Sequence, residues 1–191
     1  MGRMIATLNM TMDGYCDHTA VSPGEDAHRF FTSLLEGSDV ILYGRKTFEL
    51  MRYWDSYSEQ SPDGDGLMDF ARAYRGIRKI VFTRMLTDSD GNRAEISAIP
   101  LERSLRDLKA GDTGSILIGS PSLIRQALNL GVVDEFCVVV HPVVAGGGMA
   151  LFDGVRPMSF SGLSRQTRFD SGAVALHFET PIGIREIHGD S

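Results

Sequence analysis

Cysteine is scarce in this sequence, because Cys16 and Cys137 are the only two among 191 residues. Two cysteines cannot build the disulfide framework that supports small secreted domains, so we expect both to be reduced thiols. Positive charge is also in short supply. The 25 acidic side chains outnumber 19 lysines and arginines and leave a formal net charge of −6. The chain therefore lacks the broad basic surface that binds nucleic acid or anionic membranes.

Long hydrophobic runs are missing as well. The most apolar stretch, residues 136–152, is interrupted by a histidine, a proline and three consecutive glycines, so it would make a poor membrane helix. Near the N-terminus, polar residues at Thr7, Asn9 and Thr11 interrupt the core that a signal peptide requires. We therefore expect a soluble cytoplasmic protein with neither a membrane nor a nucleic-acid partner.

Several signatures of nucleotide and metal chemistry do not occur. The glycine run that includes Gly146 and Gly147 lacks the third glycine of GxGxxG, and no GxxxxGK[ST] sequence exists, which excludes a standard Rossmann site and a P-loop. No GxSxG, HExxH or paired-cysteine pattern is found, and the five histidines are scattered singly, so we predict no metal ion. Hydride transfer from a nicotinamide fits what is left, because it needs alignment, exclusion of water and at most one proton donor.

The most informative segment is residues 115–152, which read as strand, polar turn, helix, strand and glycine loop. An apolar run ends at Gly119, where a side chain would block close approach of a ligand. Pro121 suits the first position of the helix and Ser120 the cap before it. We expect the free N–H groups of this helix to point at an anion, and phosphate is the usual one.

A second strand-to-helix junction lies earlier in the chain. The apolar strand at residues 39–43 is followed by Gly44-Arg45-Lys46-Thr47 at the start of another helical pattern. Two such junctions could hold the two ends of one dinucleotide. Each of them alone is also what an ordinary βα loop looks like, so only the pair favours a ligand.

Strand and helix patterns alternate along the chain, which predicts an α/β fold with a largely parallel sheet and crossover helices. We expect strands at residues 4–10, 39–43, 79–83, 94–99 and 116–118, with helices around residues 27–35 and 101–108. Residues 163–169 and 173–179 flank an Asp-Ser-Gly turn and predict an antiparallel hairpin at the end of the sheet. Residues 55–69 are acidic and glycine-rich, as in a surface loop or lid. Nothing divides the chain, so we predict a single domain over residues 1–191.

A series of segments in a fixed order resembles a known family. They are TMDGY (11–15), LYGRKTFE (42–49), KIVFTR (79–84), ILIGSPSLIRQAL (116–128), VVDEFCVVVHPVVAGGG (132–148) and LF (151–152). In this order they resemble the dihydrofolate reductase superfamily, and within it the reductase domain of the bifunctional riboflavin biosynthesis protein and its stand-alone relatives. The resemblance implies a three-layer dihydrofolate-reductase-like fold, NADPH as cofactor, a homodimer and hydride transfer to a small heterocyclic substrate or to a carbonyl or imine compound.

The same resemblance implies the site residues. For the cofactor these are Gly44, Arg45, Thr47, Thr83, Arg84, Gly119, Ser120, Ser122, Gly146 and Gly147. For the substrate they are Asn9, Thr11, Asp13 and His28. Thr83 and Arg84 fall where relatives hold the adenosine 2′-phosphate, a task that suits the bidentate guanidinium. No residue in the pattern identifies the proton donor.

His28 separates the possible substrates. Folate reductases carry a carboxylate on the first helix that holds the pteridine, and counting back from Gly44 places His28 at that position. An imidazole there disfavours folate. The leading prediction is therefore an NADPH-dependent reductase similar to the one that acts on 5-amino-6-(5-phosphoribosylamino)uracil. No zinc-deaminase HxE with PCxxC accompanies it. A dihydrofolate or pterin-type reductase and a non-catalytic nucleotide-binding protein of the same fold are the alternatives.

Overall fold

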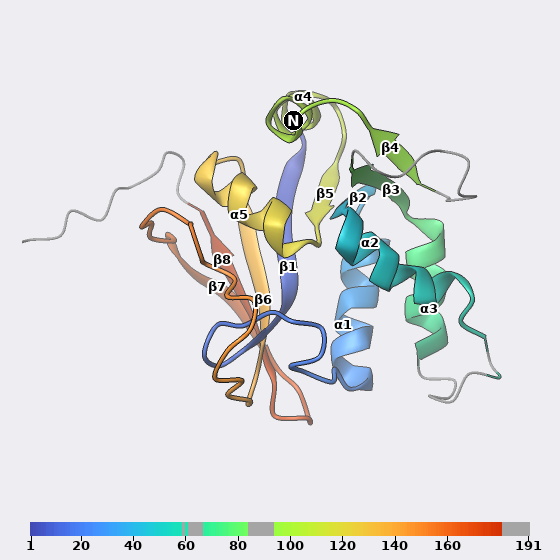
Figure 1. The fold of residues 1–191 in the computed structure, drawn as a ribbon, viewed down its shortest axis with the longest axis vertical. Coiled ribbons are helices and arrows are strands. Elements are labelled where there is room, and N and C mark those ends of the chain that lie inside the picture. The colour runs from blue at the N-terminus through green and yellow to red at the C-terminus, as the bar shows by residue number, and fades with distance from the viewer. Residues whose placement is uncertain (59, 61–66, 84–93, 181–191) are drawn as a thin grey trace, which may run out of the picture.

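The structure is a computed structural model that describes residues 1–58, 60, 67–83 and 94–180. In this part of the chain an eight-stranded sheet carries helices on both faces (Figure 1). The strands are β1 (Arg3–Thr11), β2 (Val40–Gly44), β3 (Arg78–Phe82), β4 (Glu95–Ser97), β5 (Ser115–Ile118), β6 (Glu135–His141), β7 (Gly162–Arg168) and β8 (Val174–Glu179). The helices are α1 (Glu25–Glu36), α2 (Arg45–Met51), the 3₁₀ helix η1 (Arg52–Asp55), α3 (Met68–Gly76), α4 (Leu101–Ala110) and α5 (Pro121–Asn129).

The strands lie in the order β4-β3-β2-β5-β1-β6-β8-β7. Those from β4 to β6 run parallel, whereas β8 is antiparallel to β6 and β7 is antiparallel to β8. The predicted fold, a mostly parallel sheet with antiparallel C-terminal strands, is confirmed. Because parallel strands share one direction, their carboxyl ends meet at one edge of the sheet, which we call the carboxyl edge. Both α2 and α5 begin there.

Two apolar layers fill the space on either side of the sheet. Even-numbered residues of β1, such as Met4 and Ala6, pack against α4 and α5. Ile5, an odd-numbered residue of the same strand, packs on the other face with Tyr74 of α3 and Leu35 of α1. Successive strand side chains point to opposite faces, so a strand buried on both sides reads as one apolar run. This is the three-layer arrangement that the resemblance implies.

Helix α3 was not expected from the sequence. Helix α3 begins inside the segment 55–69, which was predicted to be a loop throughout; residues 59 and 61–66 of that segment lie outside the described residues. Its buried side chains, Phe70, Ala71 and Tyr74, follow a helical spacing. The pattern was therefore present but short and preceded by an acidic stretch. The strand expected at residues 94–99 is confirmed in the shorter form of β4.

The predicted C-terminal hairpin is confirmed as β7 and β8. Gly172 in the connecting turn has φ of 84°, a value that glycine adopts without strain. All seven residues of β7 are exposed, because this strand lies at the edge of the sheet beyond the cover of the helices. None of the helices in the described part of the chain is long and apolar enough to cross a membrane.

Candidate functional site

The two predicted strand-to-helix junctions lie side by side at the carboxyl edge. They meet because β2 and β5 are neighbours in the sheet, although two strands separate them in sequence. The Gly44 N–H donates a hydrogen bond to Ser120 Oγ across 2.8 Å. The Gly119 N–H donates to the carbonyl oxygen of Leu42 across 3.2 Å. The start of α2 and the start of α5 are thus joined into one surface.

Ser120 has a different task from the one predicted. Pro121 does open α5 and Ser120 occupies the cap position, but the serine hydroxyl makes no capping bond to the helix. Its oxygen instead accepts the Gly44 N–H, and the side chain is 1% exposed. The Ser120 carbonyl accepts bonds from the N–H groups of Leu123 and Ile124, at 3.0 and 2.9 Å. The Ser120 hydroxyl therefore bonds to the end of the neighbouring strand β2 instead of capping α5. The sequence does not show this choice, because it does not show which strands are neighbours.

The two junction glycines, Gly44 and Gly119, differ in how much space a side chain would find there. A Cβ on Gly119 would lie 2.8 Å from Tyr43 Cε1, so the tyrosine ring already fills the space that a side chain would need. A Cβ on Gly44 would lie 3.4 Å from Ser122 Oγ, which is an ordinary contact. The Gly44 backbone is extended, with φ of −82° and ψ of 158°, as any residue adopts. Close packing therefore requires glycine at position 119. Beside Gly44 a small space remains next to Ser120 and Ser122, which we call the cradle.

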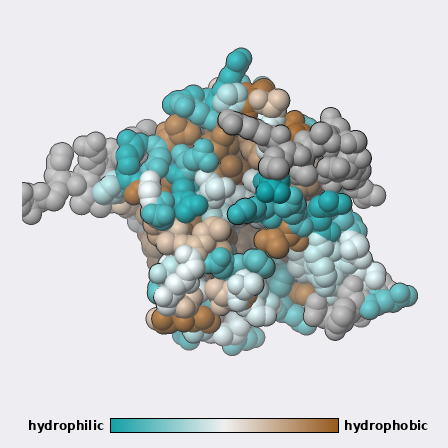
Figure 2. Space-filling view, viewed as in Figure 1, coloured by the Kyte–Doolittle hydropathy of each residue, from teal (hydrophilic) through white to brown (hydrophobic). Residues whose placement is uncertain are grey.

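Arg45, Thr47 and Thr83, three further residues predicted to bind the cofactor, lie along the same edge. Arg45 opens α2 and forms a half-exposed ion pair with Glu49, at 3.0 Å. Thr47 is half-buried in the same helix, and Thr83 directly follows β3. Arg84 lies outside the described residues. Figure 2 shows a hollow near the centre of this face, bordered by the region where α2 and α5 begin.

Thr11 and Asp13 form the framework of the turn after β1. The Asp13 carboxylate accepts the Thr11 hydroxyl at 2.6 Å and the N–H groups of Ala145 and Gly146 at 3.0 and 2.7 Å. The Thr11 hydroxyl also accepts the Tyr15 N–H at 3.0 Å. The bond from Thr11, followed by that from Gly146, lowers the pKa of Asp13 to about 2. The two side chains thus fasten the glycine loop, and their polar atoms are engaged.

The glycine loop, residues 145–149, is fastened at its other end as well. The Asp17 carboxylate accepts the Met149 N–H, and Arg125 of α5 donates to the Ala150 carbonyl at 3.2 Å. Gly146 and Gly148 have φ of 70° and 121°, which explains glycine at both positions. Gly147 lies exposed between them. The sequence analysis missed Asp17, for which no local pattern gives a signal.

Asn9 pairs with a histidine that the sequence analysis treated only as one of several scattered ones. His141, at the end of β6, places Nε2 2.8 Å from Asn9 Oδ1 and is 5% exposed. Burial lowers the pKa of His141, and the charge of Asp26 opposes that effect. Asp26, in the first turn of α1, accepts the Ala27 N–H at 2.8 Å and the Ser171 N–H at 3.2 Å. The bond between Asn9 and His141 joins β1 to β6, and the bond from Ser171 joins α1 to the turn between β7 and β8.

His28 lies in an aromatic cluster rather than beside Asn9. Its ring packs against Trp54 and Phe70, with centroids 5.4 and 5.3 Å away, and Nδ1 lies 3.0 Å from the Gly24 carbonyl oxygen. Trp54 also packs against Tyr53 edge to face and against Tyr57 at a tilt, with ring centroids 5.2 and 5.1 Å away. The described contacts of His28 therefore join α1 to η1 and α3. Its proposed role toward the substrate stays a prediction.

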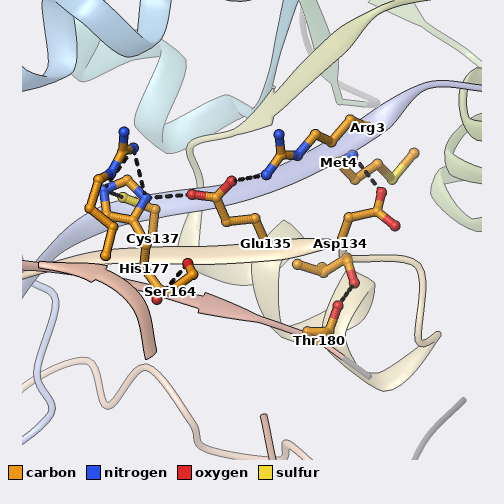
Figure 3. A network of polar contacts seen from close by, with 10 residues as sticks. Arg3, Met4, Asp134, Glu135, Cys137, Ser164, His177 and Thr180 are labelled. Atoms are coloured by element: carbon orange, nitrogen blue, oxygen red, sulfur yellow. Dashed lines mark hydrogen bonds and ion pairs between the residues drawn. The ribbon is translucent and has the colours of Figure 1, made fainter. Parts of the chain in front are cut away.

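A second polar cluster crosses the sheet on the α1 face (Figure 3). His177 Nδ1 bonds to Glu135, Cys137 Sγ lies 3.6 Å from His177 Nε2, and Arg3 pairs with Glu135 at 2.7 Å. Among the described residues, Glu135, Cys137 and His177 are the one group with metal-ligand spacing. Arg165 approaches both ring nitrogens at 3.2 Å, and burial raises the pKa of Cys137 to about 12. The Arg165 guanidinium thus lies against the His177 ring of this group.

A comparison with protein families identifies the chain over most of its length. The model described as the RibD C-terminal domain matches residues 3–171. The uncharacterized protein YyaP of Bacillus subtilis (strain 168) is 33% identical over 180 residues, which cover 91% of this chain and 93% of YyaP.

Solved structures share the fold at low sequence identity. A protein of Shewanella sp. PV-4 named for riboflavin biosynthesis has a TM-score of 0.69 and 18% identity, over 94% of this chain and 99% of its own. A pyrimidine reductase-like protein of Corynebacterium diphtheriae has a TM-score of 0.65 and 16% identity, over 95% and 92%. RibD of Acinetobacter baumannii has a TM-score of 0.68 and 15% identity, over 95% of this chain but 58% of RibD.

Proposed function

The chain belongs to the RibD C-terminal domain family, and on that premise we propose that it is a reductase that transfers a hydride from NADPH to a small heterocyclic or carbonyl substrate. The proposal rests mainly on one observation: the hydrogen bond from Gly44 to Ser120 joins the two strand-to-helix junctions into one surface. A dinucleotide has two phosphates and two nucleoside ends, so a continuous surface across two junctions suits it better than either junction alone.

The junction surface has the groups that such a cofactor needs. The cradle at Gly44 has no side chain of its own and is bordered by the hydroxyl groups of Ser120 and Ser122, and Arg45 supplies positive charge at the same helix start, as a bound phosphate requires. The buried Ser120 hydroxyl accepts one hydrogen bond, and within the described residues its own hydrogen has no acceptor. A phosphate oxygen placed there would satisfy that donor. When bound, NADPH supplies the hydride and leaves as NADP⁺.

The protein itself contributes placement rather than covalent chemistry. Burial raises the pKa of Cys16 to about 11 and that of Cys137 to about 12, so neither thiol is a nucleophile at neutral pH. The glycine loop, fastened by Asp13 and Asp17, gives a fixed wall beside the end of β1. Hydride transfer depends on such fixed geometry.

A direct assay tests the reductase. Purified protein should oxidise NADPH with a ribosylaminouracil phosphate or a simple carbonyl compound more rapidly than with dihydrofolate at matched concentrations. Rapid turnover of dihydrofolate would replace this substrate class with the folate alternative. Cofactor binding without turnover of any substrate would favour the non-catalytic alternative.

We also expect preference for NADPH over NADH, because Arg84 follows β3 where relatives hold the 2′-phosphate. Arg84→Ala should weaken NADPH binding about tenfold and leave NADH binding nearly unchanged, since a charge-assisted bond contributes roughly 1.5–3 kcal/mol. Arg78→Gln is a suitable control, because Arg78 begins the same strand at the opposite edge and pairs with Glu95. Equal wild-type affinity for both cofactors would contradict the assignment.

A homodimer is part of the proposal. Within the part of the chain that the structure describes, the outer edge of β7 pairs with no further strand, and Leu163 on it is half-exposed. Natural proteins seldom leave such an edge uncovered. Sedimentation should give twice the chain mass of 20.9 kDa. A monomer at every concentration would contradict this part of the proposal.

A further inference from the structure

Asn9 differs from the other residues predicted to bind substrate. Thr11 and Asp13 are engaged in the turn, and His28 packs in the aromatic cluster. Within the described residues Asn9 Oδ1 bonds to His141, whereas Asn9 Nδ2 has no hydrogen-bond partner. The buried side-chain atoms without partners there are Thr7 Oγ1 and Tyr74 OH, and Asn9 Nδ2 is not among them. The amide nitrogen of the half-buried Asn9 therefore reaches open space.

His141 fixes the direction of that amide. A carboxamide oxygen can only accept a hydrogen bond, so the imidazole donates from Nε2, and the amide N–H groups turn away from it. Burial lowers the pKa of His141, which keeps the ring neutral with its proton on this nitrogen. His141 is itself buried, at the end of β6, where it pairs in register with Thr11 of β1.

The surrounding charge selects the kind of group that the amide can bind. Asp13 and Asp26 both lie at this end of the sheet. Although burial raises the pKa of Asp26, bonds from Ser171 and Ala27 lower it overall, and the pKa of Asp13 is lowered to about 2. Two ionised carboxylates repel an anionic acceptor, whereas a neutral carbonyl oxygen accepts amide N–H groups without that penalty.

We propose that His141 is a positioning residue that holds the Asn9 amide so that its N–H donors bind a carbonyl oxygen of the ligand. The inference rests on the proposed reductase function and deepens it. Two bound molecules could supply such an oxygen: the carboxamide of the nicotinamide and a heterocyclic substrate such as an aminouracil. The chemistry is the same for both, and the experiment separates them.

The variants remove or restore one hydrogen bond at a time. His141→Leu removes the donor to Asn9, whereas His141→Gln restores an N–H. Asn9→Asp keeps the shape of the side chain and replaces the two outward N–H donors by an oxygen. Thr7→Val is the matched control, because Thr7 lies on the same face of β1, is 5% exposed and has an unpartnered hydroxyl.

Binding of two nucleotides and the KM for one substrate show which molecule supplies the carbonyl oxygen that Asn9 binds. NADPH and 2′-phospho-ADP-ribose share every group except the nicotinamide, and both are titrated against each variant; the KM for a ribosylaminouracil phosphate is then measured with saturating NADPH. If the oxygen belongs to the nicotinamide, His141→Leu and Asn9→Asp should weaken NADPH about tenfold and leave 2′-phospho-ADP-ribose unchanged. If it belongs to the substrate, both nucleotides should bind normally and KM should rise about tenfold. His141→Gln should recover most of either loss.

The double variant distinguishes positioning from a general structural effect. Because His141 acts through Asn9, adding His141→Leu to Asn9→Asp should cause no further loss, so the two effects should not add. Additive effects, or an Asn9→Asp variant with wild-type NADPH binding and KM, would overturn the inference while leaving the reductase function in place. A wild-type protein that binds neither nucleotide and reduces no substrate would overturn both.

Discussion

At the residue scale, the contrast between Gly44 and Gly119 gives a direct prediction. Gly119→Ala should lower the free energy of unfolding by about 1–3 kcal/mol, because the new Cβ would overlap the ring of Tyr43. Gly44→Ala should leave stability nearly unchanged, since its backbone angles are ordinary. Gly44→Val should weaken NADPH at least tenfold. Denaturant unfolding and fluorescence titration measure the two effects separately.

The sequence analysis expected both glycines to make room for a ligand. The structure supports that role at Gly44, whereas at Gly119 it points to packing against Tyr43. A Gly119→Ala variant as stable as the wild type would show that Tyr43 yields easily, and Gly119 would regain a role in ligand approach. A Gly44→Val variant that binds NADPH normally would place the pyrophosphate elsewhere.

At the scale of elements, the glycine loop depends on a carboxylate from the turn after β1. Asp13→Asn should speed hydrogen exchange at the amides of Ala145 and Gly146, because one of the two accepting oxygens is lost. The pKa of Asp13 is lowered from 3.8 to about 2, so its contribution to stability is complete above pH 3.8 and disappears as pH falls through about 2. An NMR titration of the carboxyl group checks this directly.

Asp17→Asn is the matched control for the loop. Asp17 holds the far end through the Met149 N–H, so its loss should loosen Met149 and spare Ala145 and Gly146. If both variants speed hydrogen exchange equally at all amides of the glycine loop, the two carboxylates do not hold its two ends independently.

The elements predicted correctly from the sequence are those whose own residues form a clear pattern, such as an apolar run. The apolar runs of β2 and β5 are buried on both faces and were predicted within a residue or two. Helix α3 was missed, although Phe70 and Tyr74 have helical spacing, because the segment is short and follows an acidic loop.

The site was predicted in part for the same reason. That the two junctions share an edge follows from parallel strands, but the Gly44 to Ser120 bond depends on β2 lying next to β5. The bonds that Asp13 accepts from the glycine loop and that Asn9 accepts from His141 join residues far apart in the chain. Such contacts are set by tertiary packing, for which a single sequence has no local pattern.

At the scale of the whole molecule, the buried carboxylate of Glu135 ties three parts of the sheet together. Its hydrogen bond to His177 lowers the pKa of Glu135 from its ordinary 4.5, and Arg3 adds to the effect. Glu135→Gln should lower the free energy of unfolding at pH 7 by about 3 kcal/mol, because Arg3 and Arg165 lose the charge of the carboxylate and the bond to His177 is weakened. Arg3→Gln is the control, and with its side chain 58% exposed it should cost about 1 kcal/mol or less.

The same carboxylate gives a pH dependence. A group with a lowered folded-state pKa stabilises the protein fully above pH 4.5 and progressively less as pH falls through the lowered value. Wild-type stability should therefore decline below pH 4.5 more steeply than that of Glu135→Gln. Parallel curves for the two proteins would mean that Glu135 is not ionised in the folded state.

The central place of β1 has a consequence for how the chain is made. Strand β1 precedes both of its neighbours, β5 and β6, in the chain, so during synthesis it waits for them until residues 115–141 have been made. The strands β2 and β3 can pair with each other much earlier. A nascent chain stopped before β5 would therefore present the apolar β1 without either neighbour, and chaperones that recognise exposed apolar segments should bind it most strongly at those lengths.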